Sequence, residues 1–408
     1  MPFTGTHRPS LSPRLAPVMI AVVCFGIAFV SVPLHAQTFT VLHFFNKGTG
    51  SLGGGELAEG PGGAVFGTTP AGGTGTACFQ SRQLGCGTIF RWKSGQYKPL
   101  YSFLGYPDGA FPQGGVVRDL AGNLYGVTTG GGPYDPHIGF GTVFKLDSTG
   151  KETILYPFTG GTDGSAPYAG LVLDQAGNLY GTTLGGGAFQ KGTIFKLDTA
   201  GHETPLHSFT GGADGNEPYG RLLLDESGNL YGTTVNGGDL SCEVGLGCGV
   251  IFKIDPSGNY TVLHAFGGTD GSNPYFGLVR DAHGNLYGTA QAGGAGGAGV
   301  IFKIDSANNY SVLYNFLDDS YGGYPGEVVT DPQGNLYGVT TLSASSFGTV
   351  YKLSATGGIV LLHPFSKADG EQPQNLLLDK TGVIYGTTSR GGQGGCPEGC
   401  GVLYSIAR

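Results

Sequence analysis

The sequence predicts an all-β fold: a seven-bladed β-propeller of four-stranded blades, closed by an N-terminal strand that completes the last blade. Three observations predict it. A phrase close to DQAGNLYGTT (174–183) returns about every 50 residues, each copy holds four short apolar runs bounded by turn residues, and the two ends of the chain complete one another. The aromatic residue of the phrase recurs at Phe66, Tyr125, Tyr180, Tyr231, Tyr287, Tyr337 and Tyr385.

The third copy shows the elements in order. Its predicted strands are 169–174, 178–183, 192–198 and 205–209. Asp174 begins the turn between the first two strands, because an aspartate at a turn start accepts backbone hydrogen bonds and Gly177 tolerates positive φ. Strand alternation places Tyr180 on one face and Gly181 on the other. We therefore expect the blades to stack face to face, with each such tyrosine over a glycine of its neighbour.

The two chain ends predict how the ring closes. Residues 40–45 (TVLHFF) match the fourth strand of a copy, and residues 401–406 (GVLYSI) match the third. Each strand type is present seven times only if residues 40–45 join the last blade. We predict this closure within one domain, residues 37–408. An open solenoid is the alternative, but it leaves an unpaired sheet edge, which proteins avoid.

Residues 1–36 have the layout of a secretory signal peptide. A basic region precedes an almost entirely apolar run, 15–30, and a cleavage site follows Ala36. A membrane anchor is the alternative, but an apolar run of about 16 residues is short for a span of roughly 20. We expect a secreted, periplasmic or cell-surface protein, with no membrane insertion after signal removal.

The charge balance bears on the partners. The leader holds two arginines and no acidic residue, so the remaining chain has 19 Lys and Arg against 29 Asp and Glu, a net charge of −10. An acidic chain without a basic cluster argues against nucleic acid and anionic membranes as partners. We expect a monomer whose partner is a glycan or an extracellular protein.

Six cysteines follow the leader, in three close pairs that lie in equivalent loops. Six cysteines allow 15 connectivities, but the close spacing favours local pairing, and export makes disulfides chemically reasonable. A zinc site is the alternative, and the unequal spacings without a nearby histidine fit it poorly. The predicted disulfides are Cys78–Cys86, Cys242–Cys248 and Cys396–Cys400.

The phrases GNLYGTT, GTIFKLD and PLHSFTGGADG resemble the GloVer tandem repeat of exported bacterial proteins. The resemblance covers essentially all of residues 40–406, and the first copy, PGGAVFGTT, departs most from the pattern. More distantly, the D..GNLYG pattern is similar to propeller repeats of the NHL and gluconolactonase type. The resemblance implies an exported, propeller-like protein with no established activity.

Histidines and acids follow the repeat and suggest no active site. The LHxF histidines are His43, His207, His264 and His363. Other copies hold tyrosine at this place on the outermost strand, so we interpret these histidines as edge packing and not as metal ligands. The regular aspartates are interpreted as turn caps. Calcium ligation is the alternative, but no copy has the ligand density of a calcium loop. We expect no metal and no cofactor.

Two functions of different classes remain open. The leading hypothesis is an exported, non-catalytic binding or scaffold protein for a glycan or another protein. The loop between second and third strands varies in length among the copies, and variable loops on a rigid scaffold often carry binding. The alternative is a propeller hydrolase, lactonase or lyase that acts on a carbohydrate-like substrate with a channel metal. It would use the off-pattern residues of the inner strands, Arg118, Arg221, Arg280 and Glu327.

Three tyrosines are the candidate ligand-binding residues. Tyr168, Tyr219 and Tyr275 follow the proline of the blade-to-blade loop in three adjacent copies, so we expect an arc beside the channel. Tyrosine offers a flat apolar face and a hydroxyl group, which suit sugar stacking and hydrogen bonding. The alternative is that these rings pack between blades. Solvent exposure distinguishes the two interpretations, because core rings are buried and a binding platform is exposed.

Overall fold

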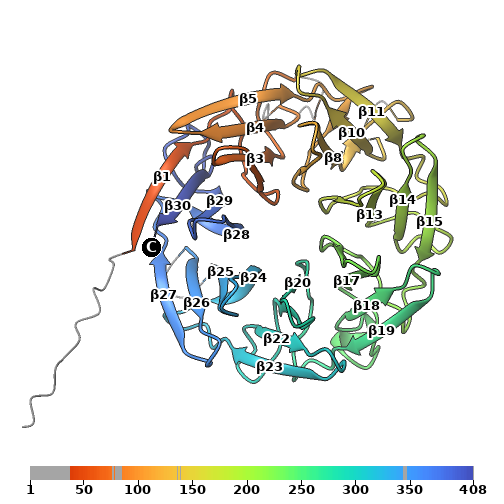
Figure 1. The fold of residues 1–408 in the computed structure, drawn as a ribbon, viewed down its shortest axis with the longest axis vertical. Helices are drawn as coiled ribbons and strands as arrows, with labels where there is room; N and C mark the ends of the chain where they lie inside the picture. The colour runs from red at the N-terminus through yellow and green to blue at the C-terminus, as the bar shows by residue number, and fades with distance from the viewer. Residues whose placement is uncertain are drawn as a thin grey trace, which may run out of the picture. The chain divides into compact units, whose positions relative to one another are not determined.

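The computed structural model describes residues 37–407 except 76, 77, 79–84, 136, 138 and 343–346. The predicted signal peptide, residues 1–36, lies outside the described residues. Residues 37–407 form seven four-stranded antiparallel sheets arranged as a ring (Figure 1). The predicted seven-bladed β-propeller is therefore confirmed. No helix in the described part of the chain has both the length and the apolar character needed to cross a membrane.

The blades are numbered along the chain, and their strands are given from the innermost to the outermost. Blades 1 and 2 contain β2 (Ala58–Gly60), β3 (Ala64–Thr69), β4 (Thr88–Lys93) and β5 (Gln96–Ser102), then β7 (Val117–Arg118), β8 (Leu124–Thr128), β10 (Thr142–Leu146) and β11 (Glu152–Pro157). Blades 3 and 4 contain β12 (Val172–Leu173), β13 (Leu179–Thr183), β14 (Thr193–Leu197) and β15 (Glu203–Ser208), then β16 (Leu223–Leu224), β17 (Leu230–Thr234), β18 (Val250–Ile254) and β19 (Tyr260–Ala265). Blades 5 and 6 contain β20 (Val279–Arg280), β21 (Leu286–Ala290), β22 (Val300–Ile304) and β23 (Tyr310–Asn315), then β24 (Gly323–Thr330), β25 (Leu336–Leu342), β26 (Thr349–Leu353) and β27 (Ile359–Pro364). Blade 7 contains β28 (Glu371–Leu378), β29 (Ile384–Arg390), β30 (Val402–Ala407) and β1 (Thr38–Phe44).

Two short elements lie outside the blades. The strands β6 (Gly109–Ala110) and β9 (Gly130–Gly131) pair with each other between the loops of blade 2. A single 3-10 turn, Glu243–Gly245, lies in the loop between β17 and β18. Both elements belong to the end of the ring that carries the loops between second and third strands.

The N-terminal strand closes the ring, as the sequence predicts. β1 pairs antiparallel with β30, from Thr38 opposite Ala407 to Phe44 opposite Val402. In Figure 1 the first strand, in red, lies beside the last strands, in blue. The last blade therefore combines the two ends of the propeller, and β1 pairs with the edge of β30 that would otherwise be unpaired.

One aromatic pair lies in each of the seven interfaces between neighbouring blades. The first ring follows the outermost strand of one blade, and the second lies on the third strand of the next blade. The pairs are Phe45–Phe90, Phe103–Phe144, Phe158–Phe195, Phe209–Phe252, Phe266–Phe302, Phe316–Tyr351 and Phe365–Tyr404. All of these rings are at most 3 % exposed. Each buried ring contributes roughly 1.5–3 kcal/mol, so the core lies between the blades.

The expected packing of tyrosine over a neighbour's glycine is wrong. Gly181 lies opposite Phe195 in the ladder of its own blade, and a Cβ atom at Gly181 would lie 2.7 Å from Cζ of that ring. The phenylalanine of the third strand therefore fills the space above the glycine. The glycine is therefore covered by a ring of its own blade and not by a tyrosine of the neighbouring blade.

The innermost strands of blades 2–5 are shorter than expected. In blade 3 the predicted strand 169–174 is reduced to Val172–Leu173. The segment before the inner strand leaves the ladder, and in blades 2, 4 and 5 one of its carbonyl groups accepts a hydrogen bond from a threonine hydroxyl of the preceding blade. Thr182 Oγ1 of blade 3, for example, donates to the carbonyl oxygen of Pro218 in blade 4 at 3.0 Å. Hydrogen bonds between blades thus replace the missing ladder bonds.

The repeated phrase is a capped hairpin, as predicted. Asp174 Oδ1 accepts a hydrogen bond from the backbone N–H of Asn178 at 2.8 Å. Its Oδ2 accepts from the Asn178 side chain at 2.7 Å and from the Tyr180 hydroxyl at 3.1 Å. The ammonium group of Lys196 lies 5.7 Å from the centre of the Tyr180 ring. The phrase therefore specifies a turn and its tyrosine contact rather than a reaction.

The LHxF histidines pack at the outer edge of the ring. His264 stacks on Tyr310 of the next blade with ring centroids 3.7 Å apart, and its Nε2 lies 2.8 Å from Asp270 Oδ2. His207 and His363 repeat this arrangement with their own aspartates. His43 stacks in the same way on Tyr97, but its Nε2 lies 3.4 Å from Thr49 Oγ1 instead of a carboxylate. Because all four imidazoles stack on an aromatic ring of the next blade, the interpretation as edge packing is confirmed.

Candidate functional site

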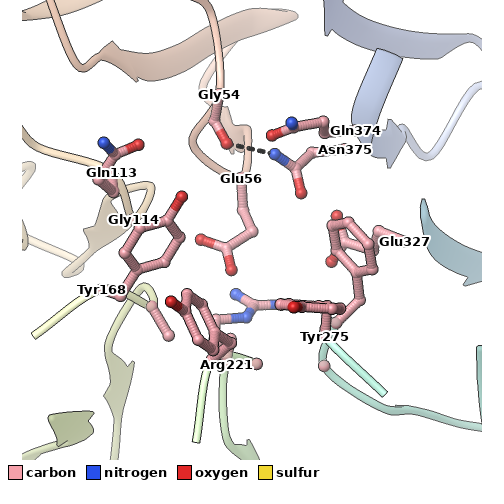
Figure 2. A pocket seen from close by; sticks show the side chains of 15 residues that line it. Gly54, Glu56, Gln113, Gly114, Tyr168, Arg221, Tyr275, Glu327, Gln374 and Asn375 are labelled. Atoms are coloured by element: carbon pink, nitrogen blue, oxygen red, sulfur yellow. Dashed lines mark hydrogen bonds between the residues drawn. The ribbon is translucent and has the colours of Figure 1, made fainter. Parts of the chain in front are cut away.

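One repeat position lines the centre of the ring. It immediately precedes the buried Leu or Val of each inner segment. The seven residues at this position are Glu56, Gly115, Gly170, Arg221, Gly277, Glu327 and Asn375. A Cβ atom at Gly170 would collide with the Glu56 carboxylate, and Cβ atoms at Gly115 and Gly277 would approach the backbones of Glu56 and Arg221 too closely. Glu56, Arg221 and Glu327 form a charged layer across the channel, which we call the channel waist (Figure 2).

Two glycines fix the position of the Glu56 carboxylate. Its Oε2 accepts a hydrogen bond from the backbone N–H of Gly115 at 2.9 Å. A Cβ atom at Gly170 would lie 2.5 Å from the same oxygen and 3.4 Å from Cδ of Arg221. A larger residue at position 170 would therefore displace Glu56. Figure 2 shows the side chains of Glu56, Arg221 and Glu327 converging on the channel.

Glu327 is the most buried acid of the waist. It is 7 % exposed, and its Oε2 accepts a hydrogen bond from the backbone N–H of Leu376 at 3.4 Å. Burial raises the pKa of Glu327, and the negative charge of Glu56 raises it further, while Arg221 and the Leu376 N–H act in the opposite direction. The waist thus holds one guanidinium and two carboxyl groups in different electrostatic environments.

Two cavities meet at the waist. The first has a volume of about 50 Å³ and is lined by the three candidate tyrosines together with Gln113, Gln374 and Asn375. The second has a volume of about 310 Å³ and extends toward the hairpin turns, where aliphatic side chains and Arg280 line it. Liquid water occupies roughly 30 Å³ per molecule, so the first cavity holds one or two waters and no sugar ring. A larger ligand at this end must lie across the channel mouth.

The three candidate tyrosines form the expected arc. Tyr168 and Tyr219 are in edge-to-face contact with ring centroids 5.0 Å apart, and Tyr219 and Tyr275 are in the same relation at 5.2 Å. All three are half-buried, so their exposure matches neither a closed core nor a fully open platform. Burial raises the pKa of each phenol group. The tyrosines therefore brace one another around the mouth, and each keeps part of its surface in solvent.

The four off-pattern residues of the inner strands do not all lie at one site. Arg221 and Glu327 meet in the waist, Arg280 lines the second cavity, and Arg118 lies outside the channel between blades 1 and 2. Sequence reasoning missed Glu56, because the first copy departs most from the repeat. Aligning Leu57 with the buried leucines of other copies would have identified it. No three His, Cys, Asp or Glu side chains among the described residues are placed to hold a metal ion.

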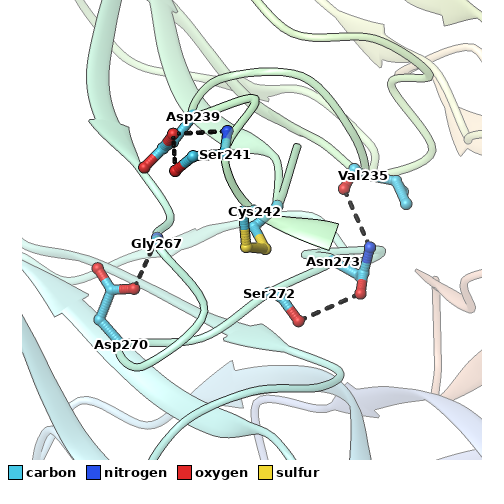
Figure 3. The surroundings of a disulfide bond; sticks show 9 residues. Val235, Asp239, Ser241, Cys242, Gly267, Asp270, Ser272 and Asn273 are labelled. Carbon is cyan, nitrogen blue, oxygen red and sulfur yellow. Dashed lines mark hydrogen bonds between the residues drawn. A yellow bond between two sulfur atoms is a disulfide. The ribbon is translucent and has the colours of Figure 1, made fainter. Parts of the chain in front are cut away.

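The cysteines form the three local pairs that the spacing predicts, Cys78–Cys86, Cys242–Cys248 and Cys396–Cys400. Figure 3 shows the pair in blade 4. A Cβ atom at Gly268 would lie 3.3 Å from Sγ of Cys242, so this disulfide packs against the loop that leads to blade 5. The disulfide therefore closes the variable loop of blade 4 on itself and packs against the connection to blade 5.

The fold is similar to solved propeller structures. A streptogramin B lyase aligns with a TM-score of 0.59 and 14 % identity, over 91 % of this chain and 97 % of that one. A catalytically inactive virginiamycin B lyase from Staphylococcus aureus, with quinupristin, aligns with a TM-score of 0.61 and 13 % identity, over 91 % and 99 %. The extracellular domain assigned to a hybrid two-component system of B. thetaiotaomicron aligns with a TM-score of 0.57 and 12 % identity, over 90 % and 41 %. Similarity at these identities shows the fold alone.

The sequence comparisons identify the repeat. No curated protein matches the chain. A family model described as the Gloeobacter/Verrucomicrobia repeat matches residues 26–175 and 137–346, which is most of the propeller. The chain therefore belongs to the Gloeobacter/Verrucomicrobia repeat family.

Proposed function

We propose that this protein is an exported, non-catalytic propeller that binds a glycan across the channel mouth. One observation carries the proposal: Tyr168, Tyr219 and Tyr275, from three adjacent blades, are half-exposed and in edge-to-face contact around one opening. Sugar rings stack on such faces, and the phenol groups supply hydrogen bonds. Gln113 and Gln374, at the same place in blades 2 and 7, add amide donors and acceptors to the rim.

Binding without catalysis is supported by the shape of the channel. Glu56, Arg221 and Glu327 line the same cavity of about 50 Å³ as the three tyrosines. Because this cavity is too small for a sugar ring, a sugar that stacks on the tyrosine arc would lie at the mouth of the cavity and not against the waist carboxylates. The arrangement therefore suits a ligand held at the mouth.

Export is supported by the three disulfides together with the leader. Disulfide bonds form and persist in oxidising compartments. Each pair lies in a loop on the end of the ring that also carries the tyrosines. The bonds would hold the shape of the loops that border the ligand.

A glycan array tests the proposal, followed by calorimetry with the selected glycan. We expect Tyr219→Ala to weaken binding, and Tyr219→Phe to retain much of it because the stacking face remains. Tyr134→Ala is the matched control, since Tyr134 is 57 % exposed and does not line the mouth. Thermal unfolding checks that each variant folds. Unchanged affinity of Tyr219→Ala, or binding to protein partners alone, would contradict the proposal.

The second candidate is a hydrolase, lactonase or lyase in which Glu327 donates a proton. A buried carboxyl group with a raised pKa in a cavity is a typical catalytic acid, and two of the similar structures are lyases. Incubation with quinupristin or an aldonolactone, with and without divalent cations, tests this candidate by mass spectrometry. Turnover that Glu327→Gln abolishes would establish catalysis and reject the non-catalytic proposal.

A further inference from the structure

A groove between blades 1 and 2 gathers four basic side chains. It has a volume of about 430 Å³ and lies at the hairpin-turn end of the blades, opposite the tyrosine arc. Arg91, Lys93, Lys98 and Arg118 line it together with a single carboxylate, Asp147. We call it the basic groove. It forms on a chain with 21 Lys and Arg against 29 Asp and Glu, so its charge opposes that of the protein as a whole.

Strand pairing assembles the basic groove from separate sequence positions. Arg91 on β4 lies directly opposite Lys98 on β5, and Lys93 points to the same face as Arg91 because side chains alternate along a strand. Arg118 reaches the groove from blade 2. The expectation that the chain lacks a basic cluster is therefore wrong. The sequence does not reveal this cluster, because its four residues do not form a continuous basic run.

The equivalent positions of blade 3 show what the repeat normally places there. Tyr180, Lys196 and Thr204 lie side by side on three neighbouring strands. Asp174 accepts the tyrosine hydroxyl, and Asp198 caps the turn after the third strand. These positions of blade 3 thus carry one positive and two negative charges.

In blade 1 the equivalent positions carry a net positive charge instead of a net negative one. Phe66 replaces the tyrosine and Gly60 replaces its aspartate partner. Arg91 replaces the lysine, Lys93 replaces the second aspartate, and Lys98 replaces the threonine. The three cations thus occupy the positions of a lysine, an aspartate and a threonine, and the other aspartate is lost to Gly60. All of the substitutions that change charge make this face of blade 1 more positive. Random divergence of one repeat copy would not favour one sign of charge.

The positive charges of the basic groove are little compensated, although Lys93 Nζ donates a hydrogen bond to the carbonyl oxygen of Pro61 at 3.2 Å. Like charges directly opposite each other on adjacent strands destabilise a sheet, and Arg91 faces Lys98. The buried Nε of Arg91 has no hydrogen-bond partner in the described part of the chain. None of the four cations lies within 4 Å of an acidic group among the described residues. Asp147 already accepts hydrogen bonds from Thr149 and Lys151 through its Oδ1.

We propose that the basic groove binds an acidic saccharide, a sugar-sized ligand that carries sulfate or carboxylate groups. Guanidinium and ammonium groups bind such oxyanions by charge-assisted hydrogen bonds. The volume falls within the range of roughly 300–1,000 Å³ typical of ligand sites, and it exceeds the needs of a bare ion. The partly exposed Leu100 lines the same groove above the buried Phe66 and Leu124 and provides an apolar contact for a sugar face. The inference goes beyond the proposed function and does not depend on it.

Calorimetry at low and high salt tests the inference with four probes: sodium sulfate, a sulfated oligosaccharide, a uronic-acid oligosaccharide and a neutral oligosaccharide of equal length. The variant Lys93→Asp with Lys98→Thr restores the residues that blade 3 holds. The matched control, Lys380→Glu with Lys191→Thr, makes the same charge change at two exposed lysines outside the groove. We expect one of the acidic oligosaccharides to bind the wild type more tightly than sulfate does. Binding to the groove variant should be at least about tenfold weaker, because two charge-assisted hydrogen bonds are lost.

Further readouts separate this site from the channel mouth. The groove variant should unfold at a higher temperature than the wild type without ligand, since it relieves the Arg91–Lys98 repulsion. Tyr219→Ala should leave binding of the acidic saccharide unchanged, so failure of the mouth proposal and failure of this one are distinguishable. The inference is overturned if the neutral probe binds equally well, if sulfate alone binds as tightly as the saccharides, if the groove variant binds like the wild type, or if only anionic lipid vesicles bind.

Discussion

Replacing Phe45 with alanine tests how the ring is held closed. Phe45 follows the N-terminal strand, is fully buried, and contacts Phe90 of blade 1 with ring centroids 5.5 Å apart. Its pair with Phe90 is the one that joins blade 7, which holds both chain ends, to blade 1. Removing a buried phenylalanine side chain costs about 3–5 kcal/mol, and a whole domain is stable by only about 5–15 kcal/mol. We therefore expect a large shift of the unfolding midpoint.

Two further variants make the comparison quantitative. Phe209→Ala removes the same ring from the interface of blades 3 and 4, so it should cost the same about 3–5 kcal/mol. Phe44→Ala is the matched control, because Phe44 precedes Phe45 and is 36 % exposed. A surface substitution of this kind changes stability by about 0.5 kcal/mol or less.

The assay is urea unfolding followed by far-ultraviolet circular dichroism and by tryptophan fluorescence. The single tryptophan, Trp92, packs in the interface between blades 7 and 1, with its ring centroid 5.8 Å from that of Tyr385. It therefore reports on the closure directly, and the two transitions should coincide in the wild type. If Phe45→Ala costs no more than Phe44→Ala while Phe209→Ala shows its full cost, the N-terminal strand does not hold the ring closed and the reasoning is refuted.

Three further predictions concern the disulfides and the pH dependence of stability. Replacing Cys242 and Cys248 together with serine should lower the free energy of unfolding by about 2–3 kcal/mol at most without unfolding the ring; loss of the native circular dichroism spectrum would contradict a local brace. Burial lowers the pKa of His43 to about 4, so its contribution to stability is full above the unfolded value of 6.5 and is lost as the pH falls toward 4. His43→Phe should therefore reduce the drop in melting temperature between pH 7 and pH 5, and an equal drop would reject this assignment. Burial and the charge of Asp163 raise the pKa of Glu203 to about 7, so its contribution is full below 4.5 and is lost as the pH rises through 7; Glu203→Gln should gain stability relative to wild type between pH 6 and pH 8 in urea unfolding, and a constant difference would contradict this.

The repeat made the fold predictable because one unit cannot bury its own aromatic rings. Tyr180 and its counterparts fixed the period, and the turn chemistry of Asp174 placed the hairpins. The matching ends, 40–45 and 401–406, then predicted the closure that β1 and β30 make. These features depend on local spacing, which a single sequence shows directly.

The details that were missed depend on contacts between distant residues. The ring that packs over Gly181 belongs to Phe195, which lies opposite it on the adjacent strand. Strand alternation alone does not reveal which ring lies there. Glu56 joins Arg221 only when seven inner segments surround one axis. Likewise, Lys98 reaches Arg91 only through the register of β4 and β5. The contacts of Gly181 and of Lys98 follow from strand register within one blade, and the contact of Glu56 with Arg221 follows from the ring geometry.

A crystal structure of the protein with the glycan selected on the array tests the central claim most directly. The account predicts a sugar ring within about 4 Å of the rings of Tyr168, Tyr219 or Tyr275, lying across the mouth with the waist residues beyond its reach. A glycan seated against Glu327 in the channel, or bound only at sites away from the three tyrosines, would contradict it.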